Sequence, residues 1–172
     1  MTRLLKSLAC LCLIDSLLYA VLAATLQRLP PQEVVCQKMT TYSDICPKMM
    51  VDNFLAGLNS IAMGTVGMAA AAAAVWIIVA YAFGDTGTPA GLRKKHPLWW
   101  VMGATGCISA ALSSHSQGGT IAYVQQSVVP TISSLAALAA LLVFFVSTLV
   151  SSPWVIRDQV PFGRRLSLVQ FP

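Results

Sequence analysis

Charged side chains are scarce in this chain of 172 residues. Asp, Glu, Lys and Arg together make up 10% of it, whereas a soluble domain carries about 25%. Hydrophobic residues make up 56%, and the mean hydropathy is +0.72. This composition excludes a disordered protein, a collagen-like protein and a highly charged nucleic-acid-binding protein. It also leaves too little polar surface for a water-soluble enzyme.

Catalytic groups are equally scarce. The chain has two histidines and six acidic residues, and it contains no P-loop, GxSxG, HExxH, CxxC or glycine-rich dinucleotide loop. The histidines, His96 and His115, stand at opposite ends of one apolar run, so they cannot share a haem within a membrane. The sequence therefore predicts a protein that is not an enzyme and holds no metal or cofactor.

Long apolar runs are what the chain does have. A helix needs about 20 apolar residues to cross the roughly 30 Å hydrocarbon core, and the runs show no strand-like alternation. The third run turns polar at 113–117, so it spans only if that end lies at the far interface or is shielded by its neighbours. The sequence predicts an all-α, four-helix membrane bundle with spans at residues 4–27, 54–83, 98–124 and 128–150.

The basic residues orient these spans. Most of the eleven Lys and Arg precede the first span, separate the second from the third, or follow the fourth: Arg3, Lys6, Arg93, Lys94, Lys95, Arg157, Arg164 and Arg165. The positive-inside rule then places both termini, the inner loop 84–97 and the inner tail 151–172 in the cytosol, with the outer loop 28–53 opposite. In an alternative interpretation, residues 1–24 form a cleaved signal peptide; Asp15 in the middle of that stretch argues against it.

Two cysteines share the predicted outer loop. Cys36 and Cys46 are separated by nine residues, and an oxidising compartment favours a disulfide between them. The alternative is a pair of free thiols.

Asp15 lies near the middle of the first apolar run. An ionised carboxylate there costs about 2.5–3.5 kcal/mol, and no Lys or Arg lies at matching depth. Two interpretations stay open: a proton or cation site, or a protonated acid hydrogen-bonded to neighbouring helices. Counting 1.5 Å per residue, the groups expected at its depth are Thr65, Thr105, Cys107 and Ser109. Asn59 and His115 are the other polar candidates, both toward the outer half.

Small residues recur at every fourth position of the later spans. The clearest members are Ala56, Ser60, Gly64, Gly67, Gly103 and Gly106. Such stripes let helix backbones approach closely. They serve either the internal packing of this bundle or the docking of another subunit, and the sequence does not separate the two.

The basic inner segments also have candidate roles. Arg93, Lys94 and Lys95 in the inner loop, with Arg164 and Arg165 in the tail, are expected to meet anionic lipid headgroups. Ser167 follows the basic pair at the spacing of a basic-directed kinase site, which makes it a candidate phosphorylation site.

The arrangement resembles the claudin-like tetraspan group, which includes the amastins. The features that match are four spans, both termini inside, Cys36 and Cys46 in the first outer loop, and the run from Cys46-Pro47-Lys48 into Phe54-Leu55-Ala56. The chain departs from that group in lacking Trp and Gly beside Cys36. The resemblance implies a structural or surface role in a membrane, without catalysis.

These observations predict a non-catalytic multi-pass protein that serves as a structural component or as an accessory subunit of a membrane complex. Its expected partners are the lipid bilayer and either further copies of itself or other membrane subunits; no nucleic acid is expected. The alternative is a small channel or proton-coupled transport protein in which Asp15, Asn59 and His115 line an oligomeric pore. The sequence does not distinguish a plasma membrane from an organelle membrane.

Overall fold

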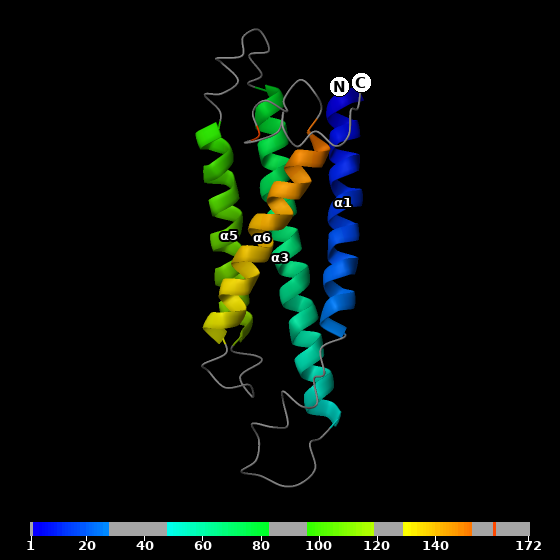
Figure 1. Cartoon of the computed structure of the whole chain (residues 1–172), viewed down its shortest axis with the longest axis vertical. Helices are drawn as coiled ribbons and strands as arrows, with labels where there is room; N and C mark the ends of the chain where they lie inside the picture. Colours follow the sequence, from blue (N-terminus) through cyan, green and yellow to red (C-terminus); the bar gives the residue numbers. More distant parts are fainter. Residues whose placement is uncertain (1, 28–47, 83–95, 119–128, 153–159, 161–172) are drawn as a thin grey trace.

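The computed structural model of the chain describes residues 2–27, 48–82, 96–118, 129–152 and 160 (Figure 1). Its elements are four helices: α1 (Thr2–Gln27), α3 (Lys48–Ala82), α5 (His96–Gly118) and α6 (Val129–Ser151). The prediction of an all-α chain is confirmed for this part of the sequence. Several predicted features lie outside the described residues: the Cys36–Cys46 disulfide, the basic residues Arg93, Lys94, Lys95, Arg164 and Arg165, and Ser167.

The helix ends follow simple backbone rules. Pro97 and Pro130 each fall in the first turn of a helix, where the missing N–H has no intrahelical acceptor to lose. Helix α3 begins at Lys48, inside the segment 28–53 that the sequence predicted as outer loop. No Gly or Pro interrupts residues 48–53, so the helix extends beyond the apolar run on which the prediction relied.

The four helices alternate in direction (Figure 1). The beginnings of α1 and α5 and the ends of α3 and α6 therefore lie together at one end of the bundle. Helix α3 packs against the other three helices, and α6 also contacts α1 and α5. In Figure 1, α6 crosses the bundle obliquely. Helix α1 thus joins the bundle through α3 and α6.

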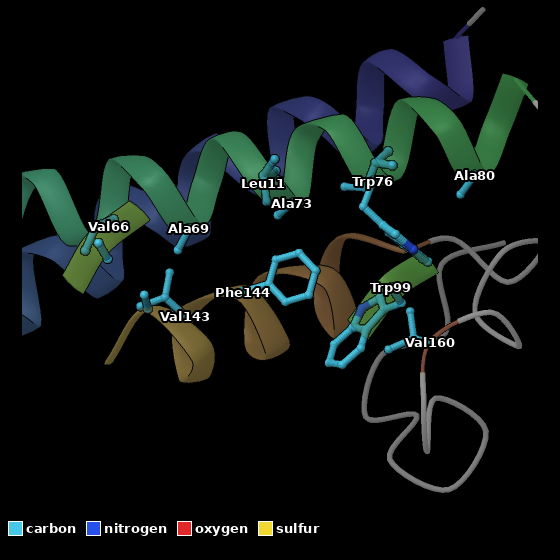
Figure 2. Close-up of a cluster of buried hydrophobic side chains, with 13 residues drawn as sticks. Leu11, Val66, Ala69, Ala73, Trp76, Ala80, Trp99, Val143, Phe144 and Val160 are labelled. Atoms are coloured by element: carbon cyan, nitrogen blue, oxygen red, sulfur yellow. The ribbon is translucent and has the colours of Figure 1, made fainter. Parts of the chain in front are cut away.

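The core is built from alanines on α3 and aromatic rings on α5 and α6 (Figure 2). Ala69 and Ala73 are fully buried, and their small side chains leave room for the ring of Phe144. The centroid of the Trp99 ring lies 4.9 Å from that of Phe144, a spacing at which aromatic pairs attract. Val160, beyond the end of α6, is buried beside Trp99 (Figure 2).

Two glycines of α5 allow this packing. A Cβ added at Gly103 would lie 2.9 Å from Cε1 of Phe144, and one at Gly106 would lie 3.2 Å from the Cβ of Ala72. Both positions therefore face neighbouring helices at close range. The other predicted small residues differ: Gly64 lies near Ser113 at an ordinary distance, Gly67 faces open space, and Ala56 and Ser60 are exposed.

The outside of the bundle is apolar. Large hydrophobic side chains are exposed on every helix, among them Leu13 and Leu17 on α1, Met63 and Ile78 on α3, Ile108 and Leu112 on α5, and Leu135 and Leu142 on α6. Three helices are long and apolar enough to cross a membrane, over Leu4–Thr25, Leu55–Ala82 and Val129–Ser151. Helix α5 is not among these three; it carries Gly103 and Gly106 within its length and Ser, His and Gln side chains at its end.

We expect Gly103→Val to destabilise the bundle by about 1–3 kcal/mol, because the new side chain has to displace the Phe144 ring. The same substitution at Gly67 meets no atom within 4 Å, so its effect should stay within about 0.5 kcal/mol. Unfolding of the purified protein in mixed detergent micelles measures both. Equal losses of stability at the two positions would show that the close contact at Gly103 is not what packs α5 on α6.

Candidate functional site

One face of α1 packs against the rest of the bundle. Ser7, Leu11 and Asp15 are 5%, 3% and 7% exposed, and Tyr19 continues the same row in a half-buried position. Residues four apart lie above one another on a helix, so these four side chains form a single stripe, called here the α1 docking face. Leu13 and Leu17, on other faces, are well exposed.

Asp15 is the centre of this face. The hydroxyl of Ser147 on α6 donates to Oδ1 of Asp15 at 2.5 Å, and Ser147 itself is fully buried. The other carboxyl oxygen, Oδ2, is buried and has no hydrogen-bond partner among the described residues. The helices that α1 contacts supply no counter-ion near it, since neither α6 nor residues 54–82 of α3 contain Lys, Arg or His. The acid is therefore held by one hydroxyl.

The prediction of which residues lie at the depth of Asp15 did not include Ser147. It named Thr65 and Thr105 among the groups level with Asp15, but both hydroxyls donate to carbonyl oxygens of their own helices, Ile61 and Val101. The count treated the four helices as upright and level. Because α6 crosses the bundle obliquely (Figure 1), Ser147 near its end reaches Asp15 instead.

The end of α6 and the residue that follows it carry four buried hydroxyls: Ser147, Thr148, Ser151 and Ser152. Ser151 and Ser152 donate to the carbonyl oxygens of Ser147 and Thr148, a common way for hydroxyls to be satisfied within a helix. Thr148 accepts a hydrogen bond from Nε1 of Trp99 on α5 at 3.1 Å. Adjacent residues thus attach α6 to two different helices, Ser147 to α1 and Thr148 to α5.

Two tyrosines complete the attachment of α1. The hydroxyls of Ser7 and Tyr81 lie 3.3 Å apart, and the hydroxyl of Tyr19 donates to Oδ1 of Asn59 at 3.0 Å. Both Tyr81 and Asn59 belong to α3. Three polar side chains of the docking face are therefore hydrogen-bonded to α3 or α6.

The predicted polar residues do not meet in one place. Asn59 is exposed and bonded to Tyr19, whereas His115 is exposed near the end of α5, a helix that packs on α3 and α6. The carboxyl of Asp15 points to Ser147 instead. No group of three or more His, Cys, Asp or Glu side chains suited to a metal ion occurs among the described residues.

The spacing of hydroxyl residues near the end of α6 is a sequence signal for its polar contacts. Two pairs of hydroxyls are spaced four residues apart after the apolar run 135–146 of α6: Ser147 with Ser151, and Thr148 with Ser152. That spacing marks two polar stripes, although it does not say which helix each stripe meets. The same is true of Trp99, whose indole N–H needs an acceptor when the ring is buried.

No protein-family model matches the chain, and no curated protein or solved structure shows significant similarity to it. The resemblance to the claudin-like tetraspan group, and the role that it implies, accordingly stay predictions.

Replacing Ser147 by Ala should weaken the attachment of α1. The change removes the donor to Oδ1 of Asp15, and hydrogen bonds between membrane helices contribute about 0.6 kcal/mol on average and up to about 1.7. Ser134→Ala is the matched control, because that exposed hydroxyl only donates to the carbonyl of Pro130 in its own helix. Unfolding in mixed micelles should show a loss for Ser147→Ala alone; an equal loss in Ser134→Ala would contradict a role for the Asp15 contact.

Proposed function

We propose that this chain is a non-catalytic multi-pass membrane protein that acts by assembly, as a structural component or as an accessory subunit of a membrane complex. The observation that carries the proposal is the placement of Asp15. Its side chain is 7% exposed and bonded to Ser147 of the same chain, so the one acid within the apolar part of α1 serves a contact between helices.

The proposal includes α5 as a fourth span. The outward side chains of α5 support it: Trp100, Val101, Ile108 and Leu112 are each more than half exposed and are suited to lipid. The small residues that lower its hydropathy, such as Gly103 and Gly106, face α6 and α3. The polar stretch 113–117 comes at the end of the helix, where an interface would lie.

The proposal also includes an orientation with both termini and the inner loop in the cytosol. The charge asymmetry of the sequence supports it, and so does the alternation of the four helix directions (Figure 1). In this orientation, Arg93, Lys94 and Lys95 meet anionic headgroups together with Arg164 and Arg165. Cys36 and Cys46 then lie on the opposite, oxidising side, where a disulfide is favoured.

Epitope tags test the four spans and the orientation together. Tags at the N-terminus, at the C-terminus and within residues 84–95 should all be on the cytosolic face of intact cells, and a tag within residues 28–47 should be on the other face. If the C-terminal tag and the tag in 84–95 lie on different faces, α5 does not span and the four-span proposal is wrong.

A transport protein is the second candidate. The unpartnered Oδ2 of Asp15 favours it, because an intramembrane acid is often part of a proton or ion path. In that case Asp15 has to exchange its proton or cation with water during turnover, with Asn59 and His115 on the path in an oligomer.

Proteoliposomes separate the two candidates. Under an imposed pH or cation gradient, we expect no flux above that of empty vesicles from the wild type, from Asp15→Asn or from the control Asp52→Asn, whose acid is exposed at the start of α3. A flux that Asp15→Asn abolishes and Asp52→Asn preserves would replace the structural proposal by the transport one.

Purification from native membrane in mild detergent then distinguishes the two structural roles. A scaffold formed by this chain alone migrates as one or more copies of itself, whereas an accessory subunit is recovered in constant ratio with other membrane chains. The exposed small residues of α3, Ala56, Ser60 and Gly67, allow close helix approach in either case.

A further inference from the structure

We propose that α1 docks on α6 with one proton bound at Asp15, so that the ligand of this buried site is a proton and the docking of α1 is linked to pH. The inference rests on the proposed function, because it takes the docking face to lie within a membrane-embedded bundle. The inference adds that the contact between α1 and α6 binds a proton and is lost at high pH.

The hydrogen bonds at Asp15 distinguish the two charge states. Ser147 is the one hydrogen-bond partner of the carboxyl among the described residues, and its hydroxyl donates to Oδ1. In the neutral acid, Oδ1 is the carbonyl oxygen that accepts this bond, and Oδ2 carries the proton. One buried O–H is then left without an acceptor. In the carboxylate, a full negative charge is left in the same place with a single donor. Burying an unpaired charge costs far more than burying an unpaired hydroxyl.

The groups that face Asp15 offer no compensation for a charge. Helix α6 has no ionisable side chain, and it meets the acid through Ser147. From α3, the titratable group that faces α1 is Tyr81, which pairs with Ser7. On α1 itself, Tyr19 is bonded to Asn59, and Lys6 is exposed. Arg3 is twelve residues from Asp15 along α1, about 18 Å along the helix axis. Cys10 and Cys12 are thiols that carry no positive charge.

Release of the proton to water therefore loosens the contact between α1 and α6. The bond to Ser147 alone has to hold the carboxylate, whereas the pairs of Ser7 and Tyr19 keep their neutral partners on α3. Stability contributed by this contact is present at low pH, where the acid keeps its proton, and is lost as the pH rises. The docking face thus holds α1 against α6 more tightly when Asp15 is protonated.

Infrared spectroscopy of the full-length protein in lipid tests the bound proton directly. We expect the carbonyl stretch of a protonated carboxylic acid at neutral pH in the wild type. It should be absent from Asp15→Asn and retained in Asp52→Asn, which removes an exposed acid at the start of α3. Identical spectra for wild type and Asp15→Asn in this region would overturn the proposal.

Unfolding as a function of pH tests the linkage. Between about pH 5 and pH 9, the unfolded chain has lost this proton while the folded bundle keeps it. The folding equilibrium constant of the wild type should therefore fall by up to tenfold per pH unit in this range. The difference between wild type and Asp15→Asn should carry this dependence, and Asp52→Asn should follow the wild type. If Asp15→Asn does not fold, Asp15→Ser supplies a second side chain that cannot ionise in this range.

The link between pH and the docking of α1 would be overturned if the stability of the wild type had the same pH profile as that of the variants at position 15. It would also be overturned if the stability of the wild type rose with pH where theirs did not. That result is distinct from failure of the proposed function. If Asp15 is ionised but the topology is as expected and no flux is seen, the proposal of a bound proton is wrong and the structural role stands. If the topology differs, or if a flux depends on Asp15, the structural role itself is wrong.

Discussion

Three of the helices are long and apolar enough to cross a membrane, where lipid offers no hydrogen bonds, and the polar contacts of the bundle suit that constraint. Exposed hydroxyls meet it within their own helices: Ser16 donates to the carbonyl of Cys12, Thr105 to that of Val101 and Ser134 to that of Pro130. Some buried polar groups also meet it across helices, as Trp99 does with Thr148 and Asp15 with Ser147. Oδ2 of Asp15 is buried without such a partner among the described residues.

Both packing and hydrogen bonds join the helices of the bundle. Helix α5 contacts α6 through the close approach of Gly103 to the Phe144 ring, and through the hydrogen bond from Trp99 to Thr148. Helix α1 places Leu11 in the apolar core, and the polar side chains of its docking face are bonded to α3 and α6. Association in lipid gains little from burying apolar surface, because the lipid is equally apolar. Close packing therefore contributes to the attachment of both helices, and the attachment of α1 also includes a few polar contacts.

The contact at Asp15 lies beside the contact between α5 and α6. With the proton that we propose at Asp15, the contact of α1 with α6 depends on pH. Ser147 and Thr148 are adjacent in the chain, so both attachments meet at the same turn of α6. A change at the Asp15 contact is then close to the aromatic packing around Trp99, within one helical turn.

The sequence by itself determined the helices and their approximate extents, because continuous apolar runs of sufficient length and the prolines at their ends depend on local composition alone. It also singled out Asp15 and the small residues of α5, since a lone acid in an apolar run and a spacing of four are visible without coordinates. Only the tertiary structure decided that Ser147 meets Asp15 and that Gly103 meets Phe144, while Gly67 faces outward. Helix tilt and rotation follow from packing between segments far apart in the chain, and a one-dimensional count of depth contains neither.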